Sequence, residues 1–256
     1  SGMALTEQMA RQAKRFGAEL GYEEATEVDL GTYPFRVRTS ATEYRAGALI
    51  ICTGANARRL GVPGEQQFIG RGVSFCATCD GYFYRDKAVV VVGGGDSAVD
   101  EALYLTRFAR QVTIVHRREE LRACPLLQRR AKANEKIRFA WNSVVEEVLG
   151  DEHVTGVRLR DVRTGEVSTL DADGVFVYVG FTPNSGLFKG QLEMTPEGYI
   201  VTDKHQRTSV PGVFAAGDVQ DPDYRQTVIA AGTGAKAAIE AQRFLAEKEF
   251  EEQEEA

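Results

Sequence analysis

The sequence of 256 residues has no apolar run long enough to cross a membrane and no recognisable signal peptide. We therefore expect no membrane contact and a location in the cytoplasm. The net charge of -6 argues against nucleic acid as a partner. No internal repeat is visible, and a content of 43% hydrophobic and 27% charged residues is typical of globular proteins with one large or two modest domains.

Cysteine and histidine are also scarce, with four and three residues. Only Cys76 and Cys79 form a close pair, whereas a structural zinc site needs a second pair at ligand spacing, so we predict no metal site. So few cysteines fit a reducing cytosol better than a secreted disulfide framework. We interpret the single residues Cys52 and Cys124 as structural, because Cys52 ends an apolar strand and Cys124 has no acid or base placed to activate it.

The close pair lies in the run Cys-Ala-Thr-Cys-Asp-Gly at residues 76–81. Two cysteines at this spacing at the start of a helix can close into a disulfide, and the helix N-terminus favours a thiolate there. Asp80 follows directly and could exchange a proton as the disulfide opens. Half of a zinc site and two inert buried thiols are the alternatives. We predict a redox-active pair.

A nucleotide-binding turn is expected shortly after the dithiol. Residues 88–92 form a continuous β-branched run, which predicts a strand buried on both faces. The spacing that follows matches G-x-G-x-x-G/A, in which the small residues allow a tight turn, a close approach to a pyrophosphate and helix packing. The turn consists of Gly93, Gly94, Gly95, Asp96, Ser97 and Ala98.

The next strand, at 112–115, indicates which dinucleotide binds. A site for NAD usually has an acidic residue after this strand, to bind the ribose 2′-hydroxyl, whereas cations suit the 2′-phosphate of NADPH. Here the residues are His116, Arg117, Arg118 and Arg122. We therefore predict NADPH. The alternative is a solvated basic helix start with Glu119 and Glu120 as partners.

These motifs, in this order, resemble the low-molecular-weight (bacterial-type) thioredoxin reductases. The similarity continues over essentially the whole chain, through the runs at 212–219, 224–226 and 231–234. The resemblance implies an α/β fold with two dinucleotide-binding, Rossmann-like three-layer domains of the flavoprotein pyridine nucleotide-disulfide oxidoreductase type. It also implies FAD and NADPH as cofactors, thioredoxin as substrate and a homodimer.

The resemblance divides the chain into an FAD domain, residues 1–57 and 185–256, and an NADPH domain, residues 58–184. The crossings are expected in the Gly- and Arg-rich stretch at 58–72 and at 180–184. The FAD residues it implies are Thr53, Gly54, Ala55, Gly217, Asp218, Arg225, Gln226 and Thr227. From the residues alone, a plain strand-ending turn explains 53–55 as well, and Asp218 equally suits a helix cap.

One departure concerns the start of the chain. Members of this family begin with a strand and a glycine-rich turn that hold the FAD pyrophosphate, and nothing before residue 93 has that turn. We therefore expect the FAD domain to lack its first βαβ unit. FAD binding by the sequence as written is in question for the same reason.

The resemblance also implies a mechanism. Electrons pass from NADPH through FAD to the Cys76–Cys79 disulfide and on to thioredoxin by thiol–disulfide exchange. Cys79 faces the flavin and forms the charge-transfer thiolate, Cys76 attacks the thioredoxin disulfide, and Asp80 is the general acid and base. The dithiol cannot meet flavin and thioredoxin at once, so one domain rotates against the other.

Two alternatives stay open. One is the flavoprotein component of an alkyl hydroperoxide reductase system, which would carry an additional N-terminal region with its own Cys-x-x-Cys. The other is an FAD-free, NADPH-binding fragment without turnover, which the intact dithiol argues against. The related NADP reductases of ferredoxin lack the dithiol and are disfavoured.

Hydrophobic periodicity predicts a helix capped by Thr6 over 6–20, a helix at 128–134 and a final helix over 227–248 with a frayed acidic tail. The four strand-like runs between 143 and 179 are expected to form one meander that completes the NADPH domain. Strands are predicted at 23–28, 35–39, 43–46, 48–52, 88–92, 112–115, 143–149, 154–160, 167–170, 174–179, 199–202 and 210–215.

Overall fold

The computed structural model describes residues 2–255, and the chain falls into two units. The first takes in the chain up to Ala55 and from Pro183 onward, and the second is Asn56–Thr182. The chain passes between them through the paired strands β5 (Ala55–Ala57) and β14 (Phe181–Pro183). The α/β class predicted from the sequence is confirmed.

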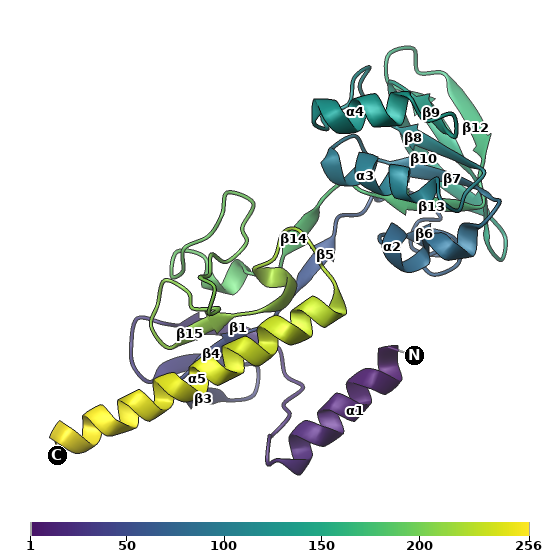
Figure 1. Cartoon of the computed structure of the whole chain (residues 1–256). Helices are drawn as coiled ribbons and strands as arrows, with labels where there is room; N and C mark the ends of the chain where they lie inside the picture. The colour runs from purple at the N-terminus through teal and green to yellow at the C-terminus, as the bar shows by residue number, and fades with distance from the viewer. Residues whose placement is uncertain (1, 256) are drawn as a thin grey trace. The chain divides into compact units, whose positions relative to one another are not determined.

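A five-stranded parallel sheet in the order β6-β13-β7-β8-β9 forms the centre of the second unit (Figure 1). Helices α3 and α4 cover one face of this sheet. The elements are β6 (Val73–Ser74), α2 (Ala77–Asp80), η1 (Gly81–Tyr84), β7 (Ala88–Val92), α3 (Asp96–Leu105), β8 (Gln111–Val115), α4 (Pro125–Lys132), β9 (Ile137–Ala140) and β13 (Gly174–Val177).

Side chains of β7 alternate between two hydrophobic cores, as the period of a strand requires. Val89 and Val91 pack with α3 and α4, whereas Val90 and Val92 pack on the opposite face. That face is covered by an antiparallel sheet of β10 (Ser143–Gly150), β11 (Val154–Asp161) and β12 (Val167–Asp171). The unit is therefore built of three layers, and burial on both faces explains the β-branched run of β7.

Two expectations for this unit were wrong. The run at 174–179 does not belong to the meander, because β13 is buried throughout and pairs in parallel with β6 and β7. The stretch at 58–72, in which the first crossing between domains was expected, instead lies inside the second unit. The Glu65 carboxylate accepts the backbone N–H groups of Leu60 and Gly61 at 2.9 and 2.8 Å, and Phe68 is buried in a core. A buried carboxylate with satisfied hydrogen bonds holds this stretch in place.

The first unit contains an antiparallel sheet in the order β1-β2-β3 and a parallel pair of β4 and β15 (Figure 1). Side chains of the parallel pair pack against β2 on one face and against α5 on the other. The elements are α1 (Gly2–Arg15), β1 (Ala25–Asp29), β2 (Phe35–Thr39), β3 (Glu43–Ala46), β4 (Leu49–Ile51), η2 (Gly186–Phe188), β15 (Val213–Ala215), η3 (Gly217–Val219) and α5 (Thr227–Glu255).

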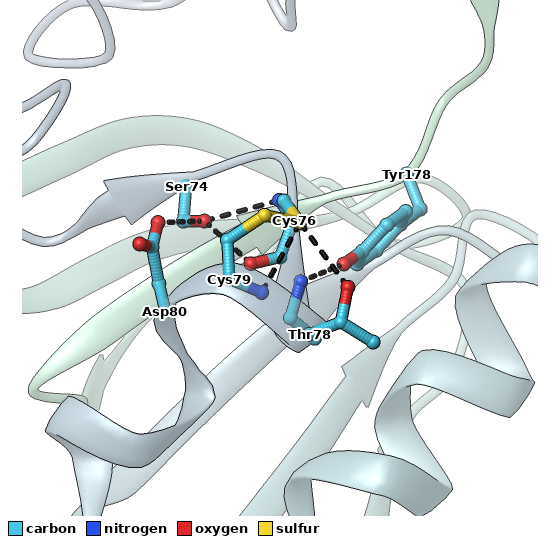
Figure 2. The surroundings of a disulfide bond; sticks show 7 residues. Ser74, Cys76, Thr78, Cys79, Asp80 and Tyr178 are labelled. Atoms are coloured by element: carbon cyan, nitrogen blue, oxygen red, sulfur yellow. Dashed lines mark hydrogen bonds between the residues drawn. A yellow bond between two sulfur atoms is a disulfide. The ribbon is translucent and has the colours of Figure 1, made fainter. Parts of the chain in front are cut away.

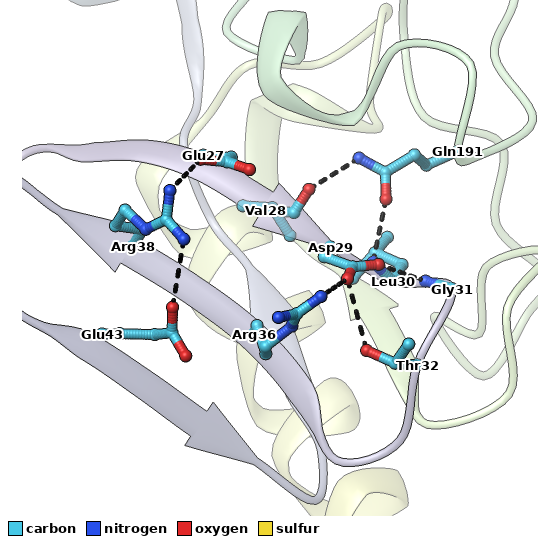
Figure 3. A network of polar contacts seen from close by, with 10 residues as sticks. All are labelled: Glu27, Val28, Asp29, Leu30, Gly31, Thr32, Arg36, Arg38, Glu43 and Gln191. Atoms are coloured by element: carbon cyan, nitrogen blue, oxygen red, sulfur yellow. Dashed lines mark hydrogen bonds and ion pairs between the residues drawn. The ribbon is translucent and has the colours of Figure 1, made fainter.

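Polar side chains hold the antiparallel sheet together and cap the free edge of β1 (Figure 3). Arg38 on β2 forms ion pairs with Glu27 and Glu43 on the two flanking strands, at 2.7 and 3.2 Å. The Gln191 amide pairs with the backbone of β1, accepting from Leu30 N and donating to the Val28 carbonyl, both at 2.8 Å. This amide satisfies two backbone groups that a sheet edge leaves open.

The ends of helices α1 and α5 differ from the prediction. Helix α1 spans Gly2–Arg15, so Thr6 lies inside it and its hydroxyl donates to the carbonyls of Gly2 and Met3. Gly17 follows with a φ of 89°, a left-handed conformation that ends a helix. Helix α5 continues to Glu255, so the acidic stretch that was expected to fray is helical.

Two predicted strands in this unit are shorter or absent. At 199–202 the structure has only an isolated bridge between Met194 and Ile200, and the strand at 210–215 is reduced to β15. Among residues 2–255, no helix is long and apolar enough to cross a membrane.

Phe176 offers a test of the second unit's core. The ring is fully buried on β13 and meets the Tyr84 ring edge-on at 5.1 Å. We expect Phe176→Ala to lower the free energy of unfolding by about 3–5 kcal/mol, because it leaves a cavity. Denaturant unfolding followed by the fluorescence of the single tryptophan, Trp141, measures this in the same unit.

Leu126→Ala is the matched control, since Leu126 is 57% exposed on α4 and should change the stability by no more than about 0.5 kcal/mol. Equal destabilisation by the two substitutions would contradict this placement of the core.

Candidate active site

Cys76 and Cys79 form a disulfide at the start of α2, with Cα atoms 5.3 Å apart (Figure 2). Cys76 is the N-cap of this helix, and its sulfur accepts the backbone N–H of Cys79 at 3.2 Å. Cys76 is half-buried, whereas Cys79 is exposed. The structure therefore brings the two predicted sulfurs together, and the helix N-terminus directs N–H groups toward the first of them.

Asp80, the predicted acid and base, is oriented by a residue that the sequence did not single out. The Ser74 hydroxyl donates to Asp80 Oδ2 at 2.7 Å and accepts the backbone N–H of Cys76 at 3.1 Å (Figure 2). Ser74 ends β6, two residues before the dithiol. One hydroxyl thus ties the carboxylate to the backbone of the reactive cysteine, which suits the predicted role of Asp80.

Tyr178 is the second residue that the sequence reasoning missed. Its hydroxyl accepts the backbone N–H of Ala77 at 2.7 Å (Figure 2). Burial, followed by the nearby Glu101 carboxylate, raises the pKa of this phenol. In the parallel register Phe176 of β13 lies opposite Ser74 of β6, which places residue 178 level with residue 76. Only knowledge of this pairing could have identified Tyr178.

The glycine turn joins β7 to α3 as predicted. Gly93 has a φ of 151°, and a Cβ atom there would lie 2.5 Å from the Tyr178 carbonyl oxygen. The carbonyl of Gly94 accepts the backbone N–H groups of Arg122 and Ala123 at 2.7 and 3.0 Å. These hydrogen bonds hold the segment that contains Arg122, a predicted phosphate-binding residue, against the glycine turn.

A cavity of about 460 Å³ opens beside the turn, and five of the predicted residues line it: Gly93, Gly94, His116, Arg117 and Arg122. The guanidinium-bearing residues Arg117, Arg118 and Arg122 are exposed. Glu119, considered above as a partner for these cations, instead forms an ion pair with Arg163 at 3.6 Å. Exposed arginines next to a glycine turn fit the 2′-phosphate and the pyrophosphate of a dinucleotide.

His116 differs in character from the arginines with which the sequence grouped it. The residue is buried, and the ring lies so close to Gly94 that a Cβ atom there would be 2.4 Å from it. Burial, reinforced by Arg122, lowers the pKa of this imidazole. At neutral pH the ring is therefore neutral, and positive charge for the phosphate comes from the arginines alone.

The residues that the resemblance assigns to FAD gather at the ends of two parallel strands in the first unit. β4 and β15 pair in register, so that Thr53-Gly54-Ala55 and Gly217-Asp218 follow adjacent strand ends. The Thr53 hydroxyl donates to the Asn184 carbonyl at 2.6 Å, and the Asn184 side chain returns a bond to the Thr53 carbonyl at 2.9 Å. This clamp fixes the turn at 53–55 at the carboxyl ends of the parallel strands, the edge at which open α/β sheets generally bind ligands.

Asp218 is half-buried, and burial raises the pKa of its carboxyl. The cap of its short helix is Ala216, so the cap alternative for Asp218 is wrong. Arg225, Gln226 and Thr227 lead into α5, whose first turns approach Gly217: a Cβ atom on that glycine would lie 3.4 Å from Ala230. The assignment of these residues to a flavin stays a prediction.

Cys52 and Cys124 are both free and exposed. Burial raises the pKa of the Cys52 thiol, which disfavours a reactive thiolate there. The interpretation of both residues as structural stays a prediction.

Comparison with known proteins places these features in context. The chain matches the pyridine nucleotide-disulphide oxidoreductase family over residues 4–234. It is 53% identical over 249 residues to a thioredoxin reductase of Rickettsia conorii, covering 95% of this chain and 80% of that protein. A thioredoxin reductase of Streptomyces coelicolor is 51% identical over 247 residues, covering 96% and 77%.

Solved structures give the same picture. The thioredoxin reductase from Streptococcus pyogenes superposes with a TM-score of 0.90 at 46% identity, covering 96% of this chain and 81% of that one. The enzyme from Giardia duodenalis gives a TM-score of 0.90 at 44% identity, covering 96% and 82%.

Gly94 allows a test of the nucleotide turn. We expect Gly94→Ala to weaken NADPH binding by roughly tenfold or more, because the new methyl group meets the His116 ring and overpacking of this kind costs about 1–3 kcal/mol. Titration calorimetry with NADPH measures the change. Gly186→Ala is the control, since a Cβ atom at Gly186 meets open space. Wild-type affinity in Gly94→Ala would show that the turn does not form the site.

Proposed function

The chain belongs to the pyridine nucleotide-disulphide oxidoreductase family and, within it, to the thioredoxin reductases, and we propose that it reduces the disulfide of thioredoxin with electrons from NADPH. One observation carries the proposal. The Cys76–Cys79 disulfide caps a helix in the same unit as a glycine turn with exposed arginines. A dithiol and a dinucleotide site together are what disulfide reduction by a nicotinamide cofactor requires.

The residues of the two units fit the two cofactors of the family. NADPH would be held by residues 93–98 with Arg117, Arg118 and Arg122, and FAD by residues 53–55, 217–218 and 225–227. The unit Asn56–Thr182 is accordingly the NADPH domain, and the other unit is the FAD domain. When bound, NADPH supplies a hydride and FAD passes the electron pair to the disulfide. We further expect a homodimer in the cytoplasm.

The thiol chemistry follows from the order of the two sulfurs. Once reduced, Cys76 is a thiolate at a helix N-terminus, where free N–H groups stabilise negative charge. It attacks one sulfur of the thioredoxin disulfide, which breaks that S–S bond and forms a mixed disulfide. Cys79 then attacks the Cys76 sulfur, restoring the intramolecular disulfide and releasing thioredoxin as a dithiol. Asp80, held by Ser74, protonates the departing thiolate.

The visible absorption spectrum of the purified chain tests the proposal directly. Under anaerobic conditions with FAD supplied, we expect flavin bands that NADPH bleaches and that thioredoxin disulfide restores. A chain that binds NADPH but acquires no flavin bands and reduces no thioredoxin would refute the proposed activity for this chain.

Cys76→Ser tests the assignment of the attacking sulfur. We expect this variant to lose thioredoxin turnover while NADPH still bleaches the flavin, because the substitution removes the attacking thiolate but leaves the nucleotide turn intact. Cys124→Ser, at an exposed and unpaired thiol, should retain full turnover. Full turnover in Cys76→Ser would contradict the role of Cys76.

Arg117 and Arg118 should determine the choice of nucleotide. Replacing both with Gln removes two charge-assisted bonds, each worth about 1.5–3 kcal/mol, so the Kd for NADPH should rise at least about a hundredfold while the Kd for NADH stays unchanged. Arg110→Gln removes an exposed arginine that lies outside the site and should leave both constants unchanged. Parallel loss of NADPH and NADH binding in the double variant would point to misfolding instead of lost phosphate recognition.

A further inference from the structure

Four arginines and two glutamates line a hollow of about 690 Å³ that includes the basic segment after β8. The charged residues of this hollow are Arg117, Arg118, Arg122, Arg163, Glu119 and Glu120. The two carboxylates offset two of the four positive charges, and the remainder matches a phosphate monoester, which carries a charge of about -1.5 to -2 at neutral pH. Arg163 is the one cation of this set that comes from a different part of the chain.

The turn between β11 and β12 carries Arg163, and hydrogen bonds hold this turn in shape. The Asp161 carboxylate accepts the backbone N–H groups of Arg163 and Thr164 at 2.7 and 2.9 Å. Gly165 follows with a φ of 76°, and its N–H donates to the Asp161 carbonyl at 2.9 Å. Arg163 takes part in these bonds only through its backbone, so a substitution of its side chain leaves them in place.

Asn142 connects this turn to the segment that contains the other arginines. Its backbone N–H donates to the Arg118 carbonyl at 3.2 Å, and its own carbonyl accepts the backbone N–H of Val162 at 2.6 Å. Two backbone hydrogen bonds through a single residue therefore place Arg163 beside the segment of Arg118. The contact joins residues far apart in sequence, which is why the basic motif gave no indication of Arg163.

The side chain of Arg163 contacts an acid of the basic segment. Its Nη1 lies 3.6 Å from Glu119 Oε2, and Glu119 directly follows the two arginines that are predicted to bind the 2′-phosphate. Among residues 2–255, neither Arg117 nor Arg118 has an ion-pair partner of its own. The carboxylate is thus neutralised from outside the segment, and both arginines keep their charge for a ligand.

An unpaired carboxylate at this place would favour the wrong nucleotide. In sites for NAD an acidic residue after this strand binds the ribose 2′-hydroxyl, and such a charge repels a 2′-phosphate. Glu119 lines the same hollow as the arginines, so without its partner it would also compete with a phosphate for them.

We propose that Arg163 is a specificity-determining residue that selects NADPH over NADH by neutralising Glu119. This inference deepens the proposed function, because it takes NADPH as the ligand of the glycine turn. An exposed ion pair of this kind contributes little to stability. Its effect is therefore expected on the choice of nucleotide and not on folding.

Titration calorimetry of the full chain with 2′,5′-ADP and with 5′-AMP isolates the 2′-phosphate and needs neither flavin nor thioredoxin. We expect Arg163→Gln to raise the Kd for 2′,5′-ADP about fivefold and to leave the Kd for 5′-AMP unchanged, because only the first ligand has a 2′-phosphate for Glu119 to repel. Arg158→Gln is the matched control. It removes a cation that pairs with Glu147 on the same hairpin but outside the hollow, so neither constant should change.

Glu119→Gln distinguishes neutralisation of this acid from a direct contact between Arg163 and the phosphate. Alone it should change the Kd for 2′,5′-ADP by no more than about twofold, since Arg163 already neutralises the carboxylate. In Arg163→Gln it should lower the Kd about fivefold and so restore the wild-type value. Glu120→Gln lies in the same hollow without an ion pair to Arg163 in the described part of the chain, and it should act equally in both backgrounds.

A wild-type preference for 2′,5′-ADP in Arg163→Gln would overturn the proposal while leaving the proposed function intact. A loss of affinity that Glu119→Gln does not restore would also overturn it, because Arg163 would then bind the phosphate itself. A wild-type chain that binds 2′,5′-ADP no more tightly than 5′-AMP would contradict both this inference and NADPH as the cofactor.

Discussion

The insertion of β13 between β6 and β7 is the constraint on which both halves of the candidate site depend. The dithiol follows β6 and the glycine turn follows β7, and the carboxyl ends of parallel strands meet at one edge of a sheet. β13 enters from a part of the chain some distance downstream, and its end supplies Tyr178 between the two. Loss of this pairing would separate the sulfurs from the turn, although both motifs are adjacent in sequence.

The basic residues after β8 differ in burial, and this difference gives them different functions. His116 lies beneath Gly94 as a neutral ring, and its lowered pKa follows chiefly from desolvation. The arginines stay exposed, where they keep their charge and can bind a phosphate in bidentate fashion. Shape and charge at the nucleotide turn are therefore supplied by different residues, and a sequence motif that lists them together conceals the division.

The parts of the site that were predictable are those specified within a few residues. The Cys-x-x-Cys pair and the glycine turn each combine a strand end with a helix start, so local spacing identifies them. Tyr178 was missed because its contact with Ala77 depends on which strands pair, and pattern alone placed β13 in the wrong sheet. Ser74 lies within six residues of both of its partners, but the Cys-x-x-Cys spacing contains no signal for the residue that precedes it. The stretch at 58–72 was misjudged for a similar reason, since only the fold reveals that Glu65 is buried and bonded.

The first unit also has turns at the ends of parallel strands, but different hydrogen bonds hold them in place. Its parallel strands β4 and β15 also end side by side, and the turns that follow carry Thr53 and Gly217. In the second unit the glycine turn is held by backbone bonds from a neighbouring segment to Gly94, whereas here a side chain, Asn184, binds the turn reciprocally. Asn184 directly follows the strand through which the chain re-enters this unit. The turn at 53–55 is therefore closed by a contact between residues 131 positions apart in sequence, which is why local spacing identifies the glycine turn but leaves 53–55 ambiguous.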